Sequence, residues 1–212
     1  MKMKTRSKAL LTVACALLLV VATVFGTFAY LTSTTETVTN TFTVGNVNIT
    51  LDETKTDENG VAVTPAARTT EGNAYKLIPG KTYIKDPTVT VKAGSEQCWL
   101  FVKVESANWP DTVTYTSNLT EANGWTDVTN TCEVTGCKLY VRIADASAST
   151  TDLTFALISG GTITASGDMT SAQAAEIAAN APKLEYTAYA VQAEGIDNAL
   201  DAWTVLNPSS AS

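Results

Sequence analysis

The chain has 212 residues, with 14 Lys and Arg against 21 Asp and Glu, a formal net charge of −7, and no histidine. The lack of histidine removes the commonest zinc ligand and the usual general base of serine and cysteine hydrolases. The acidic balance repels phosphate backbones, so nucleic acid is not an expected partner.

The N-terminus has the pattern of a secretory signal. Four cations and no acid occupy the first eight residues, and an uncharged apolar stretch follows over 9–31. A basic region, an apolar segment and then small residues are typical of a cleaved signal peptide. Thr27 and Ala29 are small residues at the −3 and −1 positions, so we expect cleavage after Ala29, with Tyr30 as the first mature residue.

The same residues leave one alternative open and argue against another. The apolar stretch is long enough for an uncleaved membrane anchor, because about 20 residues span a bilayer. Cys15 resembles a lipoprotein site, but a cut there would leave most of the apolar stretch on the product. Removal of the signal leaves ten Lys and Arg against 21 Asp and Glu. We expect a secreted protein that contacts the membrane only through the uncleaved signal.

Apolar and polar residues alternate through much of the mature chain, which predicts an all-β fold. Strands are expected at 88–92 and 98–105, and the second has apolar residues on both faces, as in a central strand. The Ala-rich segment 169–182 predicts one inserted helix, and a short closing helix is expected within 195–207. We therefore expect a jelly-roll-like β-sandwich with one inserted short helix, preceded by an N-terminal signal helix. The expected organisation is a signal peptide at 1–29, a donor-strand or linker segment at 30–44, a sandwich domain at 45–207 and a C-terminal tail at 208–212.

The segment directly after the signal has unusual composition. Seven of the twelve residues over 32–43 are Thr, and Val38, Phe42 and Val44 share one face of an extended chain. The β-branched residues favour a strand, and the segment contains no Pro and no Gly before Gly45. There the alternation slips by one residue, which separates this segment from the strand that follows.

Several stretches of the chain resemble one known family. They are "FAYLTSTTETVTNTFTVGNVNITLDE" over 28–53, the stretch 75–105 beginning "YKLIPGKTYIKDP", and "YTAYAVQAEGIDNALDAW" over 186–203. These stretches cover more than a third of the mature chain and are similar to secreted proteins with SipW-dependent signal peptides, the TasA-, CalY- and camelysin-like family. The middle of the chain, 106–183, matches less clearly.

The resemblance implies a jelly-roll subunit of extracellular matrix fibres in Gram-positive biofilms, released by a SipW-type signal peptidase. Its partners would be copies of itself and accessory matrix proteins. In such fibres the N-terminal segment of one subunit completes the sheet of the next, which assigns the donor role here to 30–44, with Val38, Phe42 and Val44 facing the acceptor. We expect this exchange because an unpaired sheet edge accepts another strand. The alternatives are a flexible stalk or pairing within the chain's own sheet.

The family also includes proteins labelled metallo-endopeptidases. A zinc peptidase of that kind needs two His one helical turn apart with a Glu as base, and this chain has no His. We therefore expect no enzymatic activity, no catalytic residues and no cofactor. Asp52, Glu53 and Asp57 are weak candidates for a Ca²⁺ site, because Ca²⁺ binds several oxygen ligands, but a solvated acidic loop over 52–60 is the simpler interpretation.

Cysteine and tryptophan leave further alternatives open. Cys132 and Cys137 flank a turn at Thr135-Gly136, so a disulfide between them is possible in a secreted protein. Cys98 then remains as a buried thiol, a partner for one of the other two, or a cross-link between subunits. The four Trp residues could mark a glycan-binding face, but aromatic residues of a β-sandwich more often belong to its core. A surface adhesin that binds glycans or host ligands is the alternative function.

Overall fold

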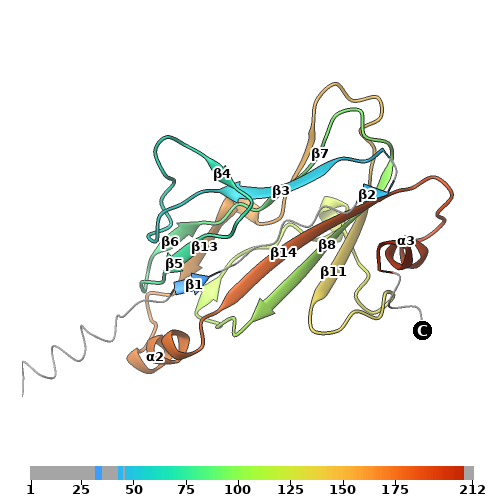
Figure 1. Cartoon of the computed structure of the whole chain (residues 1–212). Helices are drawn as coiled ribbons and strands as arrows, with labels where there is room; N and C mark the ends of the chain where they lie inside the picture. Colours follow the sequence, from blue (N-terminus) through green and yellow to red (C-terminus); the bar gives the residue numbers. More distant parts are fainter. Residues whose placement is uncertain (1–31, 35–42, 45, 208–212) are drawn as a thin grey trace, which may run out of the picture.

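The computed structural model describes residues 32–34, 43–44 and 46–207, and Figure 1 shows their arrangement. Strands in mostly antiparallel sheets dominate, and the described chain contains only two short α-helices, so the predicted all-β class is confirmed. The expected signal residues Thr27, Ala29 and Tyr30 lie outside the described residues, as do Val38 and Phe42 of the expected donor segment. In the part that the structure describes, no helix is both long and apolar enough to cross a membrane.

A five-stranded sheet forms the centre of the molecule. Its strand order is β10-β11-β8-β14-β2, and every neighbouring pair is antiparallel except β14 and β2. The five strands are β10 Thr126–Asp127, β11 Lys138–Ala144, β8 Cys98–Ala107, β14 Lys183–Gln192 and β2 Thr43–Val44.

A four-stranded sheet lies over one face of the first. Its order is β12-β7-β3-β4, and Figure 1 shows the two sheets as separate layers. One apolar core joins them, with buried residues such as Leu51 and Val89 from the second sheet and Leu100 and Val102 from the first. This arrangement is consistent with a β-sandwich. The strands are β12 Leu153–Ala156, β7 Thr88–Val91, β3 Ile49–Thr54 and β4 Arg68–Thr69.

Two smaller sheets complete the β-structure. The three-stranded sheet β6-β13-β9 is antiparallel, and the short strands β1 and β5 pair with each other. Their bounds are β6 Thr82–Ile84, β13 Thr162–Ala165, β9 Val113–Thr114, β1 Thr32–Thr34 and β5 Ala74–Lys76, and two single 3₁₀ turns occupy Glu121–Asn123 and Ser159–Gly161.

Strand β8 is buried on both faces, as the sequence predicts. Its residues Leu100 and Val102 enter the core between the sheets. Phe101 points to the opposite face, where it packs against Trp203 with ring centroids 5.2 Å apart. Trp203 belongs to helix α3, Ala199–Leu206, so this closing helix covers the outer face of the central sheet.

The inserted helix is also confirmed, as α2, Ser171–Ala179. Thr170 caps it: the Thr170 Oγ1 accepts the backbone N–H of Gln173, and the Gln173 Oε1 accepts the backbone N–H of Thr170. This reciprocal pair satisfies N–H groups that have no partner inside the helix. The helix is shorter than 169–182, because Asn180 already leaves helical geometry.

Strands β7 and β8 follow one another in the sequence but lie in different sheets. β7 pairs with β3 and β12, whereas β8 pairs with β11 and β14. The turn at 93–96, "AGSE", therefore carries the chain from one sheet to the other and does not close a hairpin. Similarly, β2 and β3 lie in different sheets, so the slip at Gly45-Asn46 marks a change of layer.

A pair of glycines tests how tightly the chain packs around Tyr83 of β6. Gly60 and Gly160 both have a φ of +69°, a left-handed conformation in which an L-residue costs about 1–2 kcal/mol. A Cβ on Gly60 would lie 2.6 Å from Cδ1 of the fully buried Tyr83, whereas a Cβ on Gly160 would meet nothing within 4 Å. We expect Gly60→Ala to lower the free energy of unfolding by about 1–3 kcal/mol more than Gly160→Ala, because overpacking adds to the backbone strain. Urea unfolding of both variants measures the difference, and equal losses would contradict the packing seen around Tyr83.

Candidate functional site

Strand β14 is paired along the whole of one side, whereas on its other side the described residues pair with only two of its positions. Its whole length pairs with β8, from Lys183 opposite Ala107 to Gln192 opposite Cys98. On the other side, the described part of the chain supplies only β2, which pairs with Ala190 and Val191. We call the backbone over 183–188 on this side the open edge.

Both described pieces of the expected donor segment pair within their own chain. β1 pairs with β5, with Ser33 opposite Tyr75, and β2 runs parallel to β14, with Thr43 opposite Ala190 and Val44 opposite Val191. Pairing within the chain's own sheet is the alternative that the sequence left open. The structure thus identifies β5 and β14 as the strands that receive this segment.

The face beside β2 is aromatic. Tyr189 of β14 packs edge-on against Trp203, with ring centroids 5.3 Å apart, and Phe101 packs against the same indole. Trp99 donates from its Nε1 to the carbonyl oxygen of Ile196 at 3.2 Å, which fixes the loop before α3. A side chain added next to Tyr189 would therefore meet a rigid apolar surface.

The three Ca²⁺ candidates do not converge. Asp52 accepts from Arg68 at 2.6 Å, and Asp57 accepts the backbone N–H groups of Asn59 and Val61, both at 2.9 Å. The hydrogen bond from Val61 is the main cause that lowers the pKa of Asp57. Glu53 is buried and pairs with Lys85. Among the described residues, no group of three or more Cys, Asp or Glu could hold a metal ion, so these candidates are not brought together.

The predicted acidic loop over 52–60 also begins later than expected. Strand β3 continues to Thr54, so Asp52 and Glu53 are strand residues on opposite faces. Glu53 follows Ile49 and Leu51 on the inward face, and only 6% of it is exposed. Its carboxylate accepts from Lys85 Nζ at 3.0 Å and from Asn73 Nδ2 at 2.8 Å. The alternation of Ile49, Leu51 and Glu53 could have indicated this buried carboxylate, but its two partners have no pattern in the sequence.

The three cysteines among the described residues, Cys98, Cys132 and Cys137, are free thiols. Cys132 is buried in the cluster beneath α3, and Cys137 is partly exposed. The possible disulfide between them is therefore not formed here. Both residues lie in the link between β10 and β11, which spans 128–137.

The tryptophans do not form one exposed face. Trp125 and Trp203 are buried, and Trp99 packs against the cluster beneath α3. Trp109 donates from its Nε1 to the carbonyl oxygen of Val113 at 2.9 Å and packs edge-on against Tyr115. These contacts hold its indole rigidly at the wall of a cleft.

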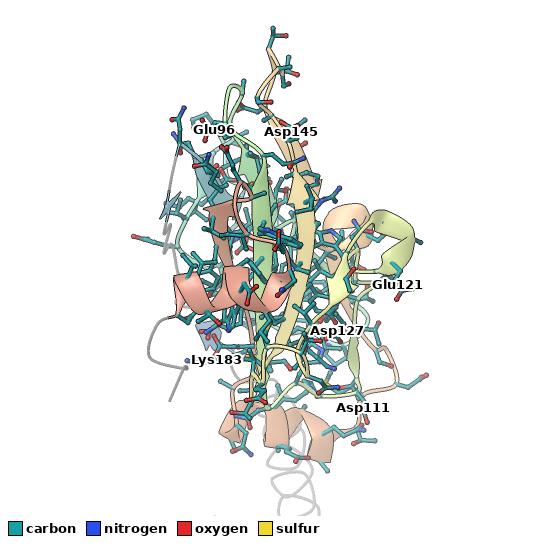
Figure 2. The ribbon with its side chains drawn as sticks, turned by 90° about the vertical axis from the view of Figure 1, so that its right-hand side faces the viewer. Glu96, Asp111, Glu121, Asp127, Asp145 and Lys183 are labelled. Atoms are coloured by element: carbon teal, nitrogen blue, oxygen red, sulfur yellow. The ribbon has the colours of Figure 1, made fainter. Side chains whose placement is uncertain are left out.

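The cleft beside Trp109, here called the polar cleft, lies between the loop after β8 and helix α2 and encloses about 510 Å³. Figure 2 shows Asp111 at the end of the molecule that carries α2, far from Glu96 and Asp145. Across the described chain, neither the Asp111 nor the Glu176 carboxylate finds a hydrogen-bond or ion-pair partner. The lining residues are Asn108, Trp109, Pro110, Asp111, Thr112, Gln173, Glu176, Ile177 and Asn180.

No protein-family model, curated protein or solved structure matches this chain.

The cysteine environments predict an order of alkylation in the mature protein. Only the thiolate reacts, and burial raises the pKa of Cys98 to about 11. Burial also raises the pKa of Cys132 and of Cys137, but only Cys137 is partly exposed. With iodoacetamide near neutral pH, we expect Cys137 to react first and the other two only after unfolding, as read by peptide mass spectrometry. If Cys137 reacts only after reduction, it forms a disulfide in the purified protein and the free thiol seen here is wrong.

Proposed function

We propose that this protein is a secreted jelly-roll subunit of extracellular matrix fibres, assembled by exchange of its N-terminal segment between copies. The observation that carries the proposal is the open edge of β14. A parallel two-residue strand of the described chain pairs with Ala190 and Val191 on this side of β14. The remaining backbone groups of the edge can accept a longer strand. The resemblance to the TasA-like family supports the same assignment.

The register of β2 predicts how a donated strand would lie. Thr43 is opposite Ala190 and Val44 is opposite Val191. If a neighbouring copy's segment continues this register, its Phe42 falls opposite Tyr189 and its Val38 opposite Glu185. Paired residues point to the same side of a sheet, so Phe42 would join the aromatic face of Tyr189 and Trp203.

The energy of such a contact is adequate for a fibre. About six to eight ladder hydrogen bonds contribute a net ~0.5–1.5 kcal/mol each, and burial of Phe42 and Val38 contributes ~1.5–3 kcal/mol each. Together they compete with the cost of association. Exchange of an element between identical copies needs no new surface, and a head-to-tail contact of this kind builds an open filament. An attached signal would hold the donor segment at the membrane and delay assembly until a SipW-type peptidase removes it.

Single substitutions in the donor segment test this function. We expect Phe42→Ala in the mature protein to slow fibre formation at least about tenfold, because a loss of about 1.4 kcal/mol weakens a contact tenfold. Val61→Ala, an exposed apolar residue outside the segment, is the control and should assemble normally. Deletion of residues 30–41 should leave a folded monomer. Electron microscopy and sedimentation measure assembly, and circular dichroism confirms folding. Fibres formed by the deletion variant would contradict the proposal.

The polar cleft supports a second candidate function, a glycan-binding surface protein. A rigid indole beside amide and carboxylate groups is suited to the apolar face and hydroxyls of a sugar. Gln173 also lines the cleft. The free carboxylates of Asp111 and Glu176 disfavour anionic polysaccharides, so the ligand would be a neutral or amine-bearing saccharide.

Binding to defined oligosaccharides tests this second candidate. We expect chitosan oligomers or a neutral β-glucan, but not alginate, to bind the mature monomer in titration calorimetry. Asp111→Asn combined with Glu176→Gln should weaken binding about tenfold or more, a change of about 1.4 kcal/mol. Glu121→Gln, an exposed acid outside the cleft, serves as control. Equal binding by both variants, or no binding by the parent protein, would remove this candidate.

A further inference from the structure

Three polar side chains meet inside the sandwich, where little of each is exposed to solvent. Glu53 lies on β3, Asn73 directly precedes β5, and Lys85 directly follows β6. Their exposed fractions are 6%, 4% and 4%. We call these residues the buried triad. A buried amine and a buried carboxylate lose their hydration, and this costs free energy unless the two groups are paired and hydrogen-bonded.

The carboxylate of Glu53 accepts from Lys85 on one oxygen and from Asn73 on the other. Its Oε2 accepts from Lys85 Nζ at 3.0 Å. Its Oε1 accepts from Asn73 Nδ2 at 2.8 Å and from the Asn73 backbone N–H at 3.1 Å. An amine and a primary amide are thus bridged by one carboxylate in a dry site.

The Asn73 amide is also oriented by the backbone of β3 and the residues after it. Its Oδ1 accepts the backbone N–H of Thr56 at 2.8 Å, and its Nδ2 donates to the carbonyl oxygen of Thr54 at 2.8 Å. The N–H of Thr56 points at the oxygen on which negative charge would develop if a nucleophile attacked Cγ. A fixed donor in this position stabilises such a charge strongly in a water-poor site.

We propose that the buried triad forms an intramolecular isopeptide bond between Lys85 Nζ and Asn73 Cγ, with release of ammonia. A proton first passes from the Lys85 ammonium to Glu53, which leaves a neutral amine and a neutral acid. The Nζ lone pair then attacks Cγ, and the C=O electron pair moves onto Oδ1, beside the Thr56 N–H.

Glu53 completes the step as a proton carrier. It gives its proton to Nδ2 and takes one from Nζ, after which the Cγ–Nδ2 bond breaks and ammonia leaves. Ammonia then takes the remaining proton from Glu53, so the carboxylate is regenerated. One C–N bond forms and one breaks, no electrons are transferred, and no other reactant is needed. Glu53 is therefore the catalytic residue of the reaction.

Space for the product lies next to the triad. A cavity of about 20 Å³ is lined by residues that include Glu53, Lys85 and Tyr186. This volume is sufficient for one water-sized molecule. Tyr75, whose ring centroid is 5.9 Å from Lys85 Nζ, helps to shield the site from water.

The cross-link would close the segment 73–85, which contains β5. In the proposed fibre β5 receives part of the donor segment through β1. The bond would therefore brace one of the two strands that carry the subunit contact. The bond itself does not depend on fibre formation, so the two proposals fail separately.

Mass spectrometry of the purified, denatured mature protein tests the bond. We expect a mass lower than that of the sequence by one ammonia, and a branched peptide that joins the Asn73 and Lys85 segments after protease digestion. The branched peptide distinguishes the bond from an Asn73 succinimide, which also loses ammonia but leaves the peptides separate. A folded parent protein with separate, unmodified Asn73 and Lys85 peptides would overturn the proposal.

Matched variants assign the roles. Glu53→Gln keeps the size of the side chain but replaces one of the two acceptor oxygens with an NH2 donor and cannot carry the proton, so the branched peptide should be lost. Lys85→Arg should abolish it as well. Lys81→Arg is the control, because Lys81 Nζ also lies near an asparagine, 3.3 Å from Asn59 Oδ1, but outside a dry site and without a bridging carboxylate. A branched peptide that persists in Glu53→Gln would overturn the role of Glu53, and if this variant does not fold, the parent protein's peptide map still decides whether the bond exists.

Discussion

The pairing of β8 with two long neighbours holds the rest of this structure together. β8 pairs along its length with β14 and with β11, so its side chains on both faces are enclosed by protein. Leu100 and Phe101 are adjacent in sequence, fully buried, and belong to two different apolar clusters. The second sheet packs on one face and α3 on the other. A substitution in this strand would therefore disturb both layers together.

The same strand order determines where the proposed assembly would occur. β8 pairs with one side of β14, and among the described residues only β2, at the end of the N-terminal segment, pairs with the other side. A contact made within one chain has the advantage of a high effective concentration, so exchange between copies requires either many copies in one place or an extended segment that cannot close back. Secretion and signal removal at a membrane would supply the first condition. In the proposed fibre, the N-terminal segment pairs either with β14 of its own chain or with β14 of a neighbouring copy, and the two arrangements are in equilibrium.

The buried triad is a polar cluster in the interior of the sandwich, between β3 and the ends of β5 and β6. Replacing one member of a buried ion pair usually destabilises a protein by about 3–5 kcal/mol, because the other charge remains without compensation. Here the amide of Asn73 and the backbone of Thr54 and Thr56 satisfy the remaining hydrogen bonds. A covalent link between Lys85 and Asn73 would close the segment 73–85, which contains β5 and β6, and fix both strands in place.

The sequence by itself determined the all-β class, the central position of β8 and both helices, because alternation and capping are local properties of the chain. The inward phase of Ile49 and Leu51 is equally local, and it extends to Glu53. Only the tertiary structure decided that β7 and β8 lie in different layers, since a turn sequence does not specify which strands will pair. It also decided that Asn73 and Lys85 meet Glu53, because these contacts join residues 20 and 32 positions apart in the chain. The polar cleft has the same origin: the loop after β8 and helix α2 are distant in sequence, and the pairing of Ala107 at the end of β8 with Lys183 at the start of β14 brings them together.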